Sequence, residues 1–418
     1  MIKNFNLVNI VLLLILIILI NKIISVFISF ENYANFNELF INYEAGFLRR
    51  GLLGQVAFFF FKKFSLSPII FFSIIFCFAN SIFFILFIKC INKFKDNLFL
   101  YFFLLLSPAT LMFGIFDSVN FFSSQIFLLI SILLHTFIAI KYLNDFKKYK
   151  IYFLYLILPI LFVNIFQYDP QILTLSSHIF VTYFVITKNN LKNYKLLSSY
   201  LILIIPIFMI VSNNGTTEQI LSLEKMKEIV NENYSFIISA HPESFSMINS
   251  NDLGGNLNLK IGAMIKIFGI YFGYDNKLYL LYAFILTIIF FIIYFGYFVD
   301  KNIYLFKINY KFTIISFLPL LSLFLFITDF GRSIHIFLIH LLAILFLLEI
   351  DKDKEKRYLK KMSFIKKGIF LVFLIIYSNT WTLSHATGWT TIFNPGGPKY
   401  ANYSSYIKEF KKIIFNSY

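Results

Sequence analysis

Residues 68–90 read PIIFFSIIFCFANSIFFILFIKC, an apolar run whose only charge is Lys89 near its end. A bilayer core requires roughly 20 apolar residues per helix, so this run predicts a membrane-spanning helix. The same test selects ten further segments along the chain, at 7–30, 97–116, 119–140, 151–168, 171–187, 196–212, 278–299, 312–328, 333–350 and 368–384. The sequence therefore predicts an all-α integral membrane protein with about 11 transmembrane helices, built as one polytopic domain over 1–418.

Composition supports that class. The chain is 59% hydrophobic and 14% charged, with a mean hydropathy of +0.77, whereas soluble domains are about 25% charged. The net charge of +16 would suggest nucleic acid in a soluble protein, but here the topology explains it and we expect no nucleic-acid partner. Cys77 and Cys90 share one apolar run, so neither a disulfide nor a metal site is predicted from them.

The distribution of positive charge orients the chain. Lys and Arg are retained on the cytoplasmic side of membrane proteins. With the N-terminus inside, the inner loops and Lys3 hold 22 of the 37 basic residues, and the outer segments hold 14 basic and 14 acidic residues. Two further apolar stretches, 57–61 and 259–274, are therefore interpreted as interfacial or re-entrant. The predicted topology is N-terminus in and C-terminus out.

This topology places three sizeable segments outside, and they are 31–67, a long extracytoplasmic loop at 213–277, and a tail at 385–418. Within the long loop, 218–232 reads EQILSLEKMKEIVNE and has a helical apolar stripe. We therefore expect a cap over the helix bundle and no separate soluble domain.

Arginine is scarce, and this makes its positions informative. Only four of the 37 basic residues are arginine, and Arg357 lies in an inner basic run. Arg49, Arg50 and Arg332 all fall outside, against the positive-inside tendency. A guanidinium binds phosphate or carboxylate with two parallel hydrogen bonds, which an ammonium cannot do. We expect these three to bind an anionic ligand, and for Arg49 and Arg50 the alternative is that they extend to lipid headgroups.

The first arginine pair lies in NYEAGFLRRGLLGQ at 42–55, preceded by Glu44. Three glycines flank the pair and would permit close approach of the backbone to a ligand, and they are Gly46, Gly51 and Gly54.

The second motif is TDFGRSIHIFLIH at 328–340, on a tight outer turn. Asp329 and Arg332 are three residues apart, and they either lock the turn as a pair or form a phosphate-binding arginine with its orienting acid. His335 and His340 do not share a helix face, so we predict no metal site there, and a buried, hydrogen-bonded His340.

Other outer titratable groups are possible general bases. Asp117 and Asp169 mark outer turns, where helix capping also explains them. His241 is the only histidine in the long loop and His385 follows the last span; imidazole titrates near neutral pH and suits proton transfer. No nucleotide, zinc-protease or serine-hydrolase motif is present.

The segments EAGFLRRGLLG and DFGRSI, with many spans and one long outer loop, resemble bacterial polytopic proteins of surface-polysaccharide assembly, in particular O-antigen and capsule repeat-unit polymerases. The resemblance implies a glycosyltransferase of the bacterial inner membrane that joins undecaprenyl-diphosphate-linked repeat units at the outer leaflet. It also implies a chain-length regulator and other assembly proteins as partners, and no cofactor. Such polymerases often carry arginines in the long loop, and this loop has none, so the two motifs are the preferred site.

Such a transfer needs cations on the diphosphate leaving group, for which we predict Arg49, Arg50 and Arg332. It also needs a base for the acceptor hydroxyl, and the candidates are Asp329, Glu44, Asp169, His241 and His385. No metal is required if the arginines stabilise the charge. The alternatives are a polyprenyl-phosphate-sugar-dependent glycosyltransferase and a lipid-linked oligosaccharide flippase or transporter, which predicts buried charges and an internal repeat.

Overall fold

The computed structural model describes residues 7–28, 39–44, 47, 50–92, 98–107, 110–116, 121, 123–168, 170–189, 195–212, 319–320 and 330–348. Within these ranges the chain is helical and contains no strand, so the predicted all-α class is confirmed for this part. The predicted spans at 278–299, 312–328 (apart from 319–320) and 368–384 lie outside the described residues, as do the long loop and the tail.

Several helices begin and end close to the predicted apolar runs, because run length and breakers are local properties. These are α1 (Leu7–Ile28), α4 (Pro68–Ile91), α11 (Gln171–Lys188) and α19 (Phe330–Leu348). In α4, Pro68 occupies the first turn, where its missing N–H would have no partner in any case.

Three predicted runs differ in detail from the helices that form. The run 97–116 is divided into α5 (Leu98–Leu106) and α6 (Leu111–Phe116), and the Ser107 carbonyl accepts the N–H of Thr110 between them. The run 119–140 becomes α8, Gln125–Lys141. Its helix therefore starts later than predicted.

The run 151–168 lies in a helix that begins earlier, at α9 (Phe146–Tyr152), because the Asp145 carboxylate accepts the N–H of Lys148 and caps the first turn. The helix continues through a π-helical turn, η3 (Phe153–Ile157), into α10 (Leu158–Gln167). Pro159 cannot donate a backbone hydrogen bond, which favours such a wider turn just before it.

The run 196–212 forms α12 (Lys195–Ser198), a 3₁₀ segment η4 (Ser199–Leu203) and α13 (Ile204–Ser212). The stretch 57–61, predicted as interfacial, lies inside α3, Leu52–Phe64. At thirteen residues α3 is about 20 Å long, which is too short to cross a bilayer core.

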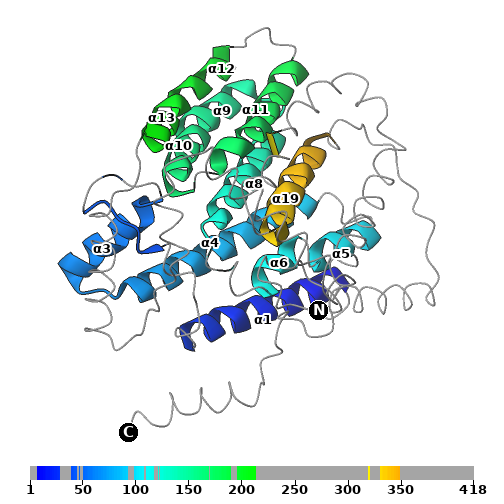
Figure 1. The fold of residues 1–418 in the computed structure, drawn as a ribbon. Coiled ribbons are helices and arrows are strands. Elements are labelled where there is room, and N and C mark those ends of the chain that lie inside the picture. Colours follow the sequence, from blue (N-terminus) through cyan, green and yellow to red (C-terminus); the bar gives the residue numbers. More distant parts are fainter. Residues whose placement is uncertain are drawn as a thin grey trace, which may run out of the picture.

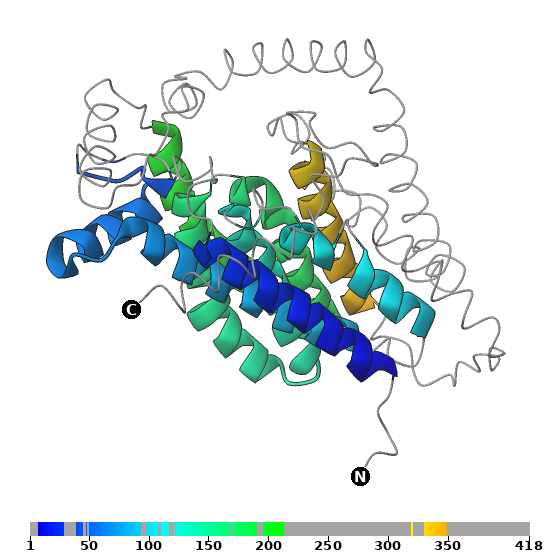
Figure 2. The same cartoon turned by 90° about the horizontal axis from the view of Figure 1, so that it is seen from below.

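Helix α8 lies at the centre of the bundle, with α4, α11 and α19 packed around it (Figure 1). Seen from below, α1 crosses the front of the bundle (Figure 2). Hydrogen bonds show that α4 and α8 run in the same direction, since the Asn80 side chain donates to the Phe121 carbonyl and Cys90 Sγ lies 3.8 Å from the Leu133 carbonyl. Helix α10 runs the opposite way, because Asn164 donates to the Phe127 carbonyl whereas Gln167, further along α10, donates to Ser124.

The outer surfaces of several helices expose large apolar side chains. Phe78 on α4 is 66% exposed, Tyr155 is 80% exposed, and Phe208 on α13 is 69% exposed. In the described part, Pro68–Ile91 and Phe146–Gln167 are the two helical segments that are long and apolar enough to cross a membrane. The count of eleven spans and the predicted topology therefore stay predictions.

Candidate functional site

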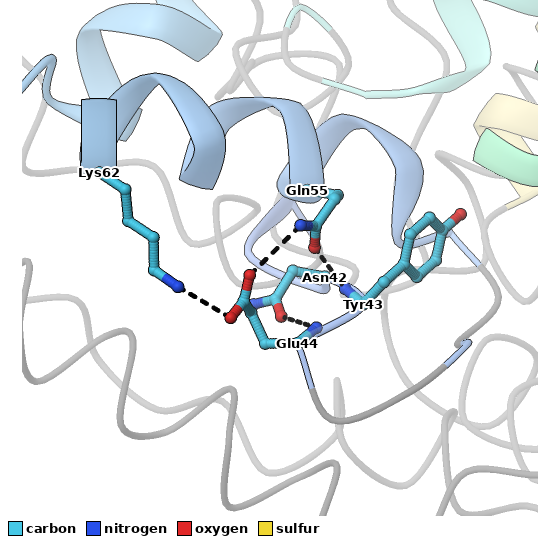
Figure 3. Close-up of polar contacts among 5 residues, drawn as sticks. All are labelled: Asn42, Tyr43, Glu44, Gln55 and Lys62. Carbon is cyan, nitrogen blue, oxygen red and sulfur yellow. Dashed lines mark hydrogen bonds and ion pairs between the residues drawn. The ribbon is translucent and has the colours of Figure 1, made fainter. Parts of the chain in front are cut away.

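Residues 42–44 of the first arginine motif lie against the first turns of α3 (Figure 3). The Asn42 side chain accepts the N–H of Glu44 at 3.0 Å, and the Gln55 side chain accepts the N–H of Tyr43 at 2.8 Å. The Tyr43 ring points away from the Glu44 carboxylate (Figure 3). Burial raises the pKa of Tyr43 to about 12, so its phenol is a neutral donor, and its hydroxyl has no hydrogen-bond partner among the described residues.

Glu44, predicted as a possible general base, is engaged with α3. Its carboxylate forms an ion pair with Lys62 at 2.9 Å and accepts a hydrogen bond from Gln55 Nε2 at 3.3 Å. The hydrogen bond from Lys62 is the main reason why the pKa of Glu44 is lowered. A carboxylate with a lowered pKa takes up protons less readily, so Glu44 is a weaker base than a free glutamate.

We expect the Lys62→Met variant to lower the free energy of unfolding by less than about 1 kcal/mol, because the ion pair is exposed. The pKa of Glu44 is lowered in the folded state, so this contribution is present above the unfolded-state pKa and is lost as the pH falls through the lowered value. Denaturant unfolding in detergent at neutral and acid pH checks the prediction. Lys63→Met is the matched control, and an equal loss at both pH values would contradict the ion-pair explanation.

Arg50 is fixed against the far end of α10. The backbone N–H of Arg50 donates to the Phe166 carbonyl at 3.0 Å. The guanidinium carbon of Arg50 lies 5.5 Å from the centre of the Tyr168 ring. The neighbouring Leu53 N–H donates to the Gln167 side chain at 2.8 Å. The structure thus brings residues 50–53 to the end of α10, more than a hundred residues along the chain.

The backbone of Arg50 has φ 65°, in the left-handed region. This conformation costs a non-glycine residue about 1–2 kcal/mol, and glycine would adopt it readily. Strained non-glycine residues occur preferentially at ligand sites. Arginine at such a position, in a chain with so few arginines, makes this side chain a candidate for ligand binding.

Gly54 packs closely against the backbone of residues 39–41. A Cβ at this position would collide with the Ile41 carbonyl oxygen and would lie 2.7 Å from that of Leu39. Its small size thus allows α3 to pack on the backbone of this chain, which explains the glycine without a ligand. Gly51 has φ −81°, which any residue can adopt.

Arg332 lies in the first turn of α19, and its side chain is half-buried. His335 is buried between Phe83 and Phe113, with ring centres 6.3 and 4.7 Å away. His340 is buried as predicted, but neither of its ring nitrogens has a hydrogen-bond partner in the described part of the chain. The prediction that His340 is hydrogen-bonded was therefore wrong for the part of the chain that the structure describes.

The remaining predicted site residues lie outside the described residues, and they are Arg49, Asp117, Asp169, His241, Asp329 and His385.

A buried row of polar side chains was missed by sequence reasoning. Its centre is a pair of histidines, His135 on α8 and His178 on α11, whose Nδ1 atoms are 3.0 Å apart. His135 Nε2 lies 2.9 Å from the Tyr149 hydroxyl, which donates to Thr182 Oγ1 at 3.1 Å. Thr182 Oγ1 in turn lies 2.9 Å from the hydroxyl of Tyr200. Apart from Tyr200, which is 8% exposed, these side chains are fully buried.

At its other end the row approaches the Arg50 loop. His178 Nε2 lies 3.4 Å from Ser131 Oγ, which is also 3.4 Å from the Gln171 side-chain oxygen. The Asn164 side chain donates to the same oxygen at 3.4 Å. One helical turn further along α10, the Gln167 side chain donates to Ser124 Oγ. The same side chain accepts the hydrogen bond from the backbone N–H of Leu53 at the start of α3. The polar interior thus begins directly at the helix end where Arg50 lies.

One sequence signal could have revealed this row. Polar residues at 171, 174, 178 and 182 recur at helical spacing within the apolar run 171–187. A polar stripe in a predicted span faces other helices, because lipid is a poor partner for it.

Among the residues that the structure describes, no group of three or more histidine, cysteine, aspartate or glutamate side chains is arranged to hold a metal ion. Comparison with family models, with curated proteins and with solved structures found no match to this chain.

Proposed function

We propose that this protein is a polytopic enzyme of the bacterial inner membrane that joins diphosphate-linked oligosaccharide repeat units at the outer leaflet. The observation that carries the proposal is Arg50, fixed in a strained backbone conformation at the end of α10. A phosphate-binding guanidinium gives a reason for both the strain and the choice of arginine.

The exposed apolar faces of α1, α4 and α13 support membrane insertion, because water-soluble monomers rarely leave such surfaces uncovered. The shared direction of α4 and α8, and the opposite direction of α10, agree with the order in which the proposed topology crosses the bilayer. Under this topology Arg50 and Arg332 lie on the outer side.

In the proposed reaction, the acceptor hydroxyl attacks the anomeric carbon of the donor sugar as its bond to the diphosphate oxygen breaks. The guanidinium of Arg50, with Arg49 and Arg332, stabilises the charge that develops on the leaving diphosphate. A base accepts the hydroxyl proton. Because Glu44 is tied to Lys62, we assign this role to one of the remaining candidates, which are Asp329, Asp169, His241 and His385.

Deletion of the gene separates this function from its alternatives. A polymerase mutant should retain a lipid core with a single repeat and lose the long-chain ladder on a gel. A repeat that lacks one sugar would instead indicate the polyprenyl-phosphate-sugar-dependent transferase, and absence of any surface repeat would indicate a flippase.

We expect the Arg332→Lys variant to retain the positive charge and yet lose most chain extension, because a lysine cannot bind a phosphate through two parallel hydrogen bonds. The measurement is the ladder produced by the variant in the deletion strain, with the amount of protein in the membrane determined by immunoblot. Near-normal chain lengths at equal expression would contradict a phosphate-binding role for Arg332.

A further inference from the structure

The buried row from Ser131 to Tyr200 contains only groups that can both donate and accept a hydrogen bond. We propose that this row, formed by Ser131, His178, His135, Tyr149, Thr182 and Tyr200, is a pathway that moves protons through the interior of the helix bundle. The juxtaposition of these side chains from α8, α9, α11 and η4 carries this inference, which does not depend on the proposed glycosyl transfer.

The bonds of the row can all point in one direction. The N–H at His178 Nδ1 donates to His135 Nδ1, and the N–H at His135 Nε2 donates to the Tyr149 oxygen. The Tyr149 hydroxyl donates to Thr182, and Thr182 donates to the oxygen of Tyr200. In this order each histidine is a neutral tautomer, and the hydroxyls of Tyr149 and Thr182 each donate one bond and accept one.

At the histidines the donor and acceptor roles depend on the tautomer, and at the Thr182–Tyr200 contact either hydroxyl can donate, so these contacts are not fixed in direction. Tyr149 is the donor to Thr182. When each proton crosses its own hydrogen bond, His178 takes up one proton at Nε2, and Tyr200 releases its original hydroxyl proton. Every side chain between them loses one proton and gains one. One proton is therefore transferred along the row, all residues are neutral before and after, and no buried charge needs to persist.

The row occupies part of the thickness of the helix bundle. Its two members on α11, His178 and Thr182, are four residues apart, about 6 Å at 1.5 Å per residue, and the hydrogen-bonded amides of Gln171 and Asn164 continue the polar interior toward the Arg50 loop. Beyond Thr182, Tyr149 lies in α9 among Lys147, Lys148 and Lys150, on the side predicted to be cytoplasmic.

Irregular helical segments position the cytoplasmic half of the row. Tyr200 lies in the 3₁₀ segment η4, and the π-turn η3 begins at Phe153. The Phe153 ring contacts His135, Tyr149 and Tyr200, with ring centres 5.6, 6.1 and 5.3 Å away. Such departures from α-helical geometry inside a helix are common at functional sites.

His340 supplies a second observation. Its ring stands edge-on to His178 with centres 6.2 Å apart, it is fully buried, and both ring nitrogens are without a hydrogen-bond partner among the described residues. An unsatisfied buried imidazole is costly and calls for an explanation. His340 lies next to His178, the histidine that takes up a proton in the transfer described above. It therefore provides one more group able to accept or deliver that proton.

The test uses the purified full-length protein in phosphatidylethanolamine–phosphatidylglycerol vesicles that contain the pH indicator pyranine. A potassium diffusion potential set with valinomycin drives proton entry. We expect vesicles with the wild-type protein to acidify faster than protein-free vesicles. Thr182→Val and Tyr149→Phe should each reduce this protein-dependent rate at least about tenfold, because each removes one bridging hydroxyl and preserves side-chain shape.

Matched controls come from the same bundle. Thr136→Val alters a fully buried threonine beside His135 whose hydroxyl has no partner within the described ranges, and Tyr101→Phe alters a tyrosine that donates only to Asn92. Both should retain the wild-type rate. Thermal unfolding in detergent identifies any variant that has lost its fold. Because Tyr149→Phe and Thr182→Val change different side chains, either one tests the proposal if the other does not fold.

A wild-type rate equal to that of protein-free vesicles would overturn the proposal, as would Thr182→Val and Tyr149→Phe variants that conduct like the wild type. Equal losses in the two control variants would also overturn it, because they would indicate a general packing defect. Arg50→Gly should retain proton flux, so failure of the proton pathway and failure of the proposed glycosyl transfer give different results.

Discussion

The Arg50→Gly variant is expected to lose chain extension by about a hundredfold and to unfold at nearly the same temperature as the wild type. Glycine adopts φ 65° without strain, which removes a cost of about 1–2 kcal/mol. The substitution also removes the contact of the guanidinium with the Tyr168 ring, worth about 0.5–1 kcal/mol. The two effects on stability nearly offset each other, whereas the phosphate-binding group is lost entirely.

The measurement pairs thermal unfolding in detergent with extension of a lipid-linked repeat unit by the purified protein. Arg50→Lys serves as the second variant, because it keeps the charge and the strained backbone and loses only the planar guanidinium. Full activity in Arg50→Gly would show that the strained arginine has no part in the chemistry. A large fall in unfolding temperature would instead show that Arg50 is retained for stability.

The Gly54→Ala variant is expected to destabilise the protein by about 3 kcal/mol or more. The added methyl group would meet the carbonyl oxygens of Ile41 and Leu39, which are backbone atoms and cannot rotate away as a side chain could. Relief would require α3 to separate from the segment at 39–41. That movement would also disturb the hydrogen bonds that Gln55 forms with Tyr43 and Glu44. We therefore expect chain extension to fall together with stability.

Unfolding by denaturant in detergent checks this prediction. Gly51→Ala is the matched control, since it introduces the same methyl group three residues earlier on a backbone with φ −81°, and its cost should be below about 1 kcal/mol. If Gly54→Ala were as stable as Gly51→Ala, the close packing of α3 against residues 39–41 would be refuted.

The sequence by itself predicted the helical class and the position of most described helices. The ends of α4 at Pro68 and of α11 at Lys188 lie within one residue of the predicted runs. These features are local, because an apolar run, a proline in the first turn and a charged last turn all act within a few residues of the helix that they define. Where a helix departs from its run, as in α9, the cause is also local, namely the Asp145 cap.

Only the tertiary structure revealed what those helices bring together. The sequence singled out Arg50 by its rarity, but its bond to Phe166 joins residues more than a hundred positions apart. Gly54, interpreted from sequence as a ligand-approach residue, instead meets the chain's own backbone. His135 and His178 lie in separate apolar runs of the sequence, and only the packing of α8 on α11 makes them a hydrogen-bonded pair. Run length and composition are properties of a single segment, whereas a shared bond depends on which faces of two segments meet, and that is decided by the packing of the whole bundle.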